Sequence, residues 1–232
     1  MKVKKYPQSC LLVTTAKHRI LVDPGNLKYQ EKFMTEWLVA DIILVTHRHA
    51  DHCNVEVIKS LNRPIYSTKE VAKACPELKN INIVKSGMKP LKIGDVSIEV
   101  VDAVHGYNPR LKHNKAEVHE NVGFIIDDGE TRLYVTSDTI CFNNEYKADY
   151  VAAPITGYGL TMTAFETGLF AKETGAKQLI VTHLDNETYP TDVAVAEKTF
   201  QDLEVAYTIP AIGEEFEIKG EPKEDHGQKR KK

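Results

Sequence analysis

Short hydrophobic runs rich in β-branched residues recur along the first third of the chain and predict strands closed by turns. Residues 11–14 and 19–22 form two such runs around a hairpin turn, and Asp23-Pro24-Gly25 ends the second. Residues 42–45, Ile-Ile-Leu-Val, show no polar alternation, which is typical of a strand buried on both faces. A further strand is expected over 64–67 and helices over 31–38, 55–60 and 69–74, so this part alternates between α and β.

The second half begins with β pattern and returns to α/β alternation. Residues 96–104 alternate between apolar and polar and lead to His105, and residues 122–127 and 131–136 predict a hairpin about Asp128-Gly129. Strands over 150–153, 178–182 and 204–208 then alternate with helices over 163–173 and 192–201. Residues 106–120 show no periodicity, and a loop of that length is typical of a functional segment.

Three similar phrases end on side chains that can bind a metal. Ile43 to His47 and Leu179 to His183 share the pattern of three aliphatic residues, Thr and His, and Leu133 to Asp138 is a variant that ends on Asp. Each phrase is a buried strand followed by a potential ligand. We therefore expect strands from two sheets to converge on one edge, where functional residues gather.

Size and charge favour a compact soluble domain. The 232 residues are expected to form one domain over 1–219, with a polar and basic disordered tail over 220–232 that ends in Lys-Arg-Lys-Lys. The net charge of −3 is spread along the chain and predicts neither a nucleic-acid partner nor a membrane surface. No run approaches the roughly 20 apolar residues of a membrane span, and residues 1–5 lead into strand-like sequence, so a cytoplasmic location is expected. The four cysteines have no paired spacing and are expected to be free thiols.

The run from Thr46 to His52 carries the strongest chemical signal. His47 and His49 are two apart and project to the same side of an extended chain, while Asp51 and His52 follow on a turn. An exposed polar loop is the ordinary alternative, but a bound metal explains the crowding of four ligand-type side chains far better. The four could hold one ion by themselves. Neighbouring side chains leave the backbone in different directions, however, which suits two ions that take further ligands from His105, Asp138 and His183.

The order of these residues, with Asp23 upstream, resembles the metallo-β-lactamase superfamily from about Val3 to Phe216. The resemblance implies an α/β fold: an αββα four-layer sandwich of two mixed β-sheets with helices on the outer faces. It also implies a dinuclear metal-dependent hydrolase with a metal-bridging hydroxide as nucleophile. The ions would be zinc, with manganese or iron as alternatives. The implied ligands are His47, His49 and His105 for the first ion, Asp51, His52 and His183 for the second, and Asp138 as the bridge.

One of these ligands and three other residues are candidates for supporting roles. Asp51 could also orient the hydroxide and carry a proton to the leaving group. The resemblance implies that Asp23 supports the site through hydrogen bonds, although in Asp-Pro-Gly it could simply form the turn. Gln8 stands before Ser9-Cys10 and is expected near the site. His119 lies in the irregular loop, where a substrate contact or an ordinary surface position are both open.

Residues 154–157 (Pro-Ile-Thr-Gly), 161–163 (Thr-Met-Thr) and Glu166 resemble the compact ascorbate-6-phosphate-lactonase-like group. That group commonly has His where this chain has Gln8, and glutamine does not exchange a proton near neutral pH. We therefore expect a small-molecule ester, lactone or phosphoester as substrate, without carrying over the lactone itself. One alternative is a nuclease or phosphodiesterase that uses Arg48, Arg110, Lys112, Lys115 and the basic tail. The other is a non-hydrolytic iron redox or sensor protein. The sequence does not indicate an oligomeric state.

Overall fold

Two seven-stranded mixed sheets form the centre of the fold. The computed structural model describes residues 1–107 and 118–220, so residues 221–232 of the predicted tail over 220–232, and Arg110, Lys112 and Lys115 of the loop, lie outside the described residues. The first sheet has the order β14 (Glu215–Glu217), β1 (Lys2–Lys5), β2 (Leu11–Thr14), β3 (Arg19–Val22), β4 (Ile42–Val45), β5 (Ile65–Ser67) and β6 (Ile81–Ile83). The second has the order β13 (Tyr207–Thr208), β12 (Gln178–Thr182), β11 (Tyr150–Pro154), β10 (Arg132–Val135), β9 (Val122–Asp127), β8 (Val96–Asp102) and β7 (Leu91–Ile93).

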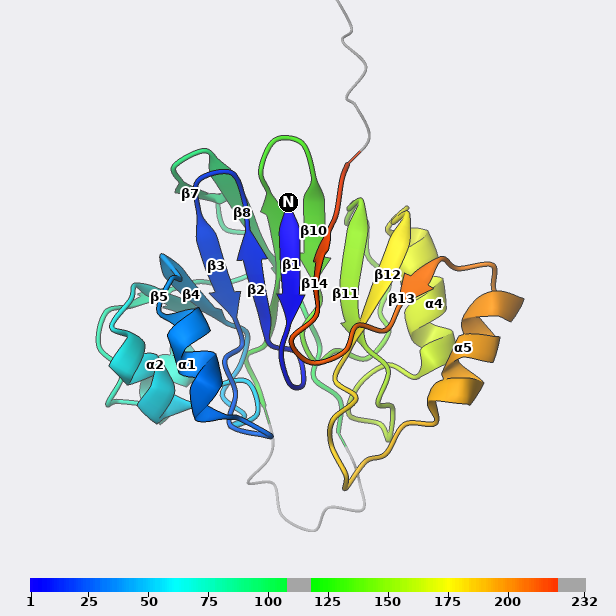
Figure 1. Ribbon diagram of the computed structural model, residues 1–232, viewed down its shortest axis with the longest axis horizontal. Coiled ribbons are helices and arrows are strands. Elements are labelled where there is room, and N and C mark those ends of the chain that lie inside the picture. The colour runs from blue at the N-terminus through cyan, green and yellow to red at the C-terminus, as the bar shows by residue number, and fades with distance from the viewer. Residues whose placement is uncertain (108–117, 221–232) are drawn as a thin grey trace, which may run out of the picture.

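Helices cover the outer face of each sheet. In Figure 1, α1 (Glu31–Trp37) and α2 (Val55–Leu61) lie on one side of the molecule, and α4 (Ala164–Glu173) and α5 (Val193–Asp202) on the other. Apolar side chains of α1, α2 and the short α3 (Lys69–Ala74) pack with β2 to β5, and those of α4 and α5 pack with β10 to β12. A third apolar cluster lies between the two sheets. The predicted αββα sandwich is confirmed.

Strand β4 shows why its sequence has no polar alternation. Ile42 and Leu44 belong to the cluster between the sheets, whereas Ile43 and Val45 belong to the cluster under the helices. Successive side chains of a strand point to opposite faces, so a strand covered on both faces is apolar throughout. Packing on both faces therefore fixes the strand in place. His47, two residues after the strand ends at Val45, lies at the edge of the sheet.

Some predicted boundaries were wrong. Strand β8 ends at Asp102 rather than at residue 104, because the Val104 N–H bonds to Thr139 Oγ1 at 2.9 Å and not to a neighbouring strand. The strand expected over 204–208 is only Tyr207–Thr208, since Glu204 adopts a left-handed φ of 54° after α5. Strands β6 and β14 were not predicted at all. Both lie at a sheet edge, and each is only three residues long, which leaves little periodicity to detect.

The carboxyl ends of the strands that precede the predicted site residues meet at one edge of the sandwich. Strands β3 and β4 are parallel, and in the other sheet β10 and β12 run with β11, while β8 lies two antiparallel pairings from β10 and so shares its direction. Parallel strands bring the residues that follow them to the same edge.

Among the described residues, none of the helices has the length and apolar character needed to cross a membrane.

Candidate metal centre

Three histidines form a first donor group at this edge. Ring nitrogens of His47, His49 and His105 all lie within 4.8 Å of one another. His47 Nε2 is 3.1 Å from His49 Nδ1, and the His105 ring approaches both from the end of β8. The sequence predicted these three as the ligands of one ion, and the fold brings them together in that set.

A second donor group contains Asp51, His52 and His183, again with donor atoms within 4.8 Å of one another. Asp51 Oδ2 lies 3.4 Å from His183 Nε2 and 4.0 Å from His52 Nε2. His52 is fully buried, whereas the Asp51 side chain is 25% exposed. This group therefore combines two buried imidazoles with one carboxylate that solvent can reach.

Asp138 lies between the two groups. Its Oδ2 atom is 3.1 Å from His183 Nε2, 3.3 Å from His52 Nε2 and 3.9 Å from His105 Nε2. One carboxylate oxygen thus approaches histidines of both groups. This is the position that a carboxylate shared by two cations would require.

Two buried polar atoms support a metal in this place. Among the described residues, His52 Nε2 and Asp138 Oδ1 are shielded from solvent and make no well-oriented hydrogen bond, although Asp138 Oδ2 lies 3.3 Å from His52 Nε2. Leaving a buried polar atom unpaired costs about 1–3 kcal/mol, so such atoms call for an explanation. Divalent ions held by the two groups would satisfy both atoms. Imidazole and carboxylate donors suit zinc and also accept manganese or iron.

Asp23 orients His52 from behind. The fully buried Asp23 carboxylate accepts hydrogen bonds from the Thr46 N–H, the Thr46 hydroxyl and His52 Nδ1, each at 2.8 Å. A proton on Nδ1 leaves Nε2 of His52 free to bind a metal. Asp23 belongs to neither of the two donor groups and is not grouped with Asp138 among the described residues. The geometry therefore matches a supporting role through hydrogen bonds rather than ligation.

Three other histidines are oriented in the same way, through Nδ1. His47 Nδ1 lies 3.0 Å from Thr46 Oγ1, His183 Nδ1 lies 2.8 Å from Thr156 Oγ1, and His105 Nδ1 lies 2.8 Å from the Gly106 carbonyl oxygen. Neither Thr46 nor Thr156 was predicted to have a role. A signal was present, because Thr directly precedes His47 and Thr156 belongs to the phrase 154–157.

Gln8 is buried at the second donor group. Its Nε2 donates to Asp51 Oδ2 at 3.2 Å and lies 3.1 Å from His183 Nε2. Its Oε1 accepts the Asp185 N–H at 3.0 Å, and its own N–H donates to Asp185 Oδ2 at 2.7 Å. The carboxamide is therefore fixed from one side by the backbone of residue 185 and directed at the site from the other.

His119 belongs to neither donor group. It is exposed, its N–H donates to Glu70 Oε2 at 3.0 Å, and its side chain lines a surface pocket with Arg48. A residue that the sequence did not single out, Asn121, is closer to the centre. Its side chain donates to the Asp138 carbonyl oxygen and accepts from the Ser137 hydroxyl, both at 2.8 Å. Asn121 therefore fixes the backbone that carries Asp138.

Several site residues adopt a left-handed backbone that side chains other than glycine seldom take. The φ angle is 47° at Asp23, 59° at His183 and 57° at Gln8, and it is 65° at Ser137, next to Asp138. Such conformations cost about 1–3 kcal/mol each and gather at functional sites. Here they turn the chain sharply as it leaves or approaches a strand, so that the side chains face the centre.

Charge and burial shift the titration of the cluster. Burial by itself raises the pKa of Asp138, but the imidazoles of His183 and His52 bring it well below its ordinary value. Burial likewise lowers the pKa of His183, but Asp138 and Asp51 raise it to about 9. The pKa of His47 is well below its ordinary value because of burial and the neighbouring His52. Without a cation, Asp138 therefore stays anionic and His47 neutral, whereas His183 holds a proton near neutral pH that a bound cation would displace.

Comparison with known proteins agrees with this centre. The family model described as β-lactamase superfamily domain matches residues 2–183. A UPF0173 metal-dependent hydrolase of Nanoarchaeum equitans is 30% identical over 169 residues, which cover 68% of this chain and 72% of that protein.

Solved structures share the fold. Igni18, a metallo hydrolase from Ignicoccus hospitalis, superposes with a TM-score of 0.77 at 20% identity, over 94% of this chain and 99% of that chain. An isothiocyanate hydrolase from Delia radicum gut bacteria gives a TM-score of 0.76 at 18% identity, over 95% and 100% of the two chains. By the family model and the archaeal relative, the chain belongs to the β-lactamase superfamily, among its UPF0173 metal-dependent hydrolases.

Proposed function

We propose that the chain uses two divalent ions to hydrolyse a small ester, lactone or phosphoester. The observation that carries the proposal is the position of Asp138 Oδ2, within 3.9 Å of histidines from both donor groups. His47, His49 and His105 would hold one ion, Asp51, His52 and His183 the other, and Asp138 both. Ions bound in this way lower the pKa of water towards neutrality and polarise a carbonyl or phosphoryl oxygen.

The residues of the chain supply orientation and proton transfer. The Asp51 side chain is 25% exposed, whereas that of Asp138 is 5% exposed. Of these two carboxylates, Asp51 is therefore the one that a substrate entering from solvent can reach. Its Oδ2 accepts a hydrogen bond from Gln8, which fixes the carboxylate. From that position Asp51 can orient the attacking water by accepting its proton and then deliver the proton to the leaving group.

Replacement of Asp138 tests this proposal. Asp138→Ala should abolish hydrolysis of reporter esters and phosphodiesters while far-UV circular dichroism stays as in the wild type. Asp202→Ala, at a side chain that is 65% exposed, removes the same charge far from the centre and should keep full activity. Retained hydrolysis by Asp138→Ala would overturn the assignment of Asp138 between two ions.

The substrate class needs a panel of compounds. Lactones, thioesters, phosphodiesters and β-lactams should be tested with zinc, manganese and iron, and the isothiocyanate hydrolase of the same fold supports adding an isothiocyanate.

Assignment to the lactonase-like group stays a prediction. Of the basic residues on which the nuclease alternative depends, the structure describes only Arg48. Its Nε atom is paired with Glu70 at 2.7 Å. Hydrolysis of an oligonucleotide that falls steeply with salt would favour it.

A further inference from the structure

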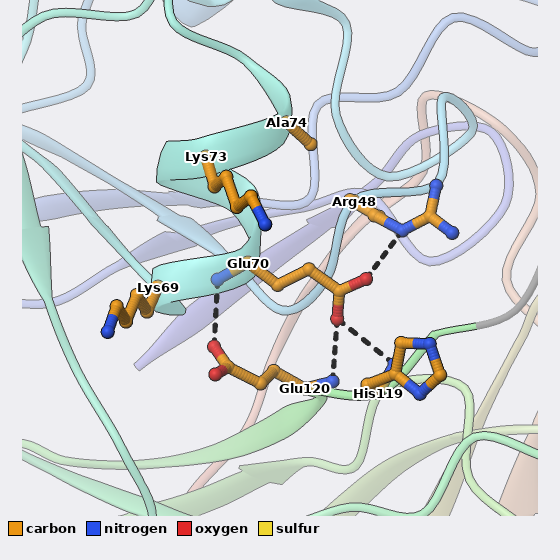
Figure 2. A pocket seen from close by; sticks show the side chains of 7 residues that line it. All are labelled: Arg48, Lys69, Glu70, Lys73, Ala74, His119 and Glu120. Carbon is orange, nitrogen blue, oxygen red and sulfur yellow. Dashed lines mark hydrogen bonds and ion pairs between the residues drawn. The ribbon is translucent and has the colours of Figure 1, made fainter.

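A surface pocket of about 500 Å³ is lined in part by Arg48, which stands between the predicted ligands His47 and His49 in the sequence. It is lined by three basic side chains, two carboxylates and two further residues: Arg48, Lys69, Lys73, Glu70, Glu120, Ala74 and His119. Figure 2 shows α3 carrying Lys69, Glu70 and Lys73 on one side, with Arg48, Glu120 and His119 facing it. The pocket thus joins α3 to the ligand run and to the segment before β9.

Both carboxylates of the pocket are occupied by bonds within the protein. Glu70 Oε1 accepts from Arg48 Nε at 2.7 Å, and Glu70 Oε2 accepts the N–H groups of His119 and Glu120 at 3.0 and 2.7 Å. Glu120 Oε2 in turn accepts the Glu70 N–H at 2.8 Å (Figure 2). Although burial raises the pKa of Glu70, these donors bring it below its ordinary value, so it stays charged. Glu70 therefore links α3 to Arg48 and to the backbone of residues 119 and 120.

The two lysines have no such partners. Lys69 and Lys73 are four residues apart on α3, so they share one face of the helix, and both are exposed. Among the residues that the structure describes, neither ammonium group takes part in a hydrogen bond or ion pair that would neutralise it. Among the described residues, the charged groups that line the pocket are three cations and two anions, which gives this part of the lining a net positive charge. A concave surface of this kind attracts anions.

The chain links two walls of the pocket to the metal centre. Arg48 stands between the predicted ligands His47 and His49 in the sequence. On the opposite wall, Glu120 precedes Asn121, whose side chain donates a hydrogen bond to the Asp138 carbonyl oxygen.

We propose that this pocket binds an anionic group of the substrate, a carboxylate or a phosphate, that is remote from the bond being cleaved. Lys69 and Lys73 would bind it through their ammonium groups, and the Arg48–Glu70 pair would hold the wall in place. The inference rests on the proposed function, because it names a substrate class for that same site. Anionic esters should then be better substrates than neutral ones of similar size.

A double variant tests the pocket. Lys69→Ala with Lys73→Ala removes both ammonium groups, and alanine favours the helix. Lys59→Ala with Lys92→Ala is the matched control, because it removes the same charge at exposed positions on α2 and β7. Two readouts are needed: kcat/KM for mono-4-nitrophenyl succinate against neutral 4-nitrophenyl acetate, and calorimetric titration of the metal-loaded proteins with succinate and with inorganic phosphate.

The proposal predicts that kcat/KM for the succinate ester falls about tenfold in the pocket variant, mainly through KM, while the acetate ester is unaffected. The control should behave like the wild type. The titration should weaken in parallel, and whichever anion loses more affinity identifies carboxylate or phosphate as the natural group. Added salt should reduce the difference between the proteins.

The titration separates failure of the pocket from failure of the hydrolase. If the wild type cleaves neither ester, the proposed activity on such esters fails, but weaker anion binding by the pocket variant still supports the pocket. If the pocket variant binds both anions as tightly as the wild type, only the metal centre binds them, and the proposal is overturned whatever the hydrolysis shows.

Discussion

Asp23→Asn separates the two roles open to Asp23, as a turn residue or as the support of His52. The carboxylate is fully buried and accepts three hydrogen bonds of 2.8 Å, two from Thr46 and one from His52 Nδ1. Asparagine keeps the shape of the side chain and its capacity to form the turn. Its amide nitrogen, however, must face either the Thr46 N–H or the Nδ1–H of His52, and both are donors.

The structure sets the size of the effect. A hydrogen bond to a charged group contributes about 1.5–3 kcal/mol, and a buried donor left unpaired costs a similar amount, so we expect a loss of about 3 kcal/mol in the free energy of unfolding. Because His52 also loses the partner that presents Nε2 to the site, metal affinity should fall about ten- to a hundredfold.

Urea unfolding of the chelator-treated protein measures the first quantity, and competition with a chromophoric chelator measures the second. Asp41→Asn is the matched control, since Asp41 is exposed and accepts the Arg19 N–H in another turn. Because asparagine can still form the turn, unchanged values for both quantities would show that Asp23 serves the turn alone and would refute its support of His52. A loss of stability with unchanged metal affinity would show that the hydrogen bonds of Asp23 hold the fold without preparing His52 for a metal.

Three further predictions follow from single contacts. A Cβ at Gly25 would stand 1.8 Å from the Asp51 carbonyl oxygen, so Gly25→Ala should displace the ligand run and lower the melting temperature; an unchanged melting temperature would contradict this close approach. Gln8→Ala removes the hydrogen bonds to Asp51 and from the Asp185 N–H, so the free energy of unfolding in urea should fall by about 1–3 kcal/mol. A fall of less than about 0.5 kcal/mol would contradict this prediction. Without metal, the pKa of His183 is raised to about 9, because Asp138 and Asp51 outweigh burial. The protonated His183 then stabilises the folded protein fully below a pH of about 6.5, and this contribution, up to about 3 kcal/mol, is lost as the pH rises through 9. Urea unfolding of chelator-treated protein at a pH of about 6 and about 10 measures the loss. Unfolding curves that coincide at the two pH values would rule out the raised pKa of His183.

The fold was predictable where the chain is apolar throughout or strictly periodic. Residues 42–45 and 178–182 became β4 and β12 with the expected boundaries, because a strand buried on both faces has a sequence that little else explains. The edge strands β6 and β14 were missed, since a short strand paired on one side has no such constraint. The end of β8 depends on Thr139, a residue that is 35 positions away from Val104.

The site was predictable as far as the residues that offer metal-binding atoms. His and Asp at strand ends are conspicuous, and the topology of the two sheets brings all seven predicted ligands to one edge. The residues that orient them were harder to find. Asn121 and Thr156 act through contacts between segments distant in sequence, and Asn and Thr occur at many surface positions for other reasons. The pocket beside Arg48 likewise depends on Glu70, which no motif singles out.

The metal content of the protein tests the central claim most directly. Elemental analysis of wild-type protein purified without added metal should give two divalent ions per chain, and Asp138→Ala should give fewer, because Asp138 Oδ2 approaches both donor groups. A single iron per chain, or an Asp138→Ala protein that keeps two ions at unchanged affinity, would contradict the two-metal account.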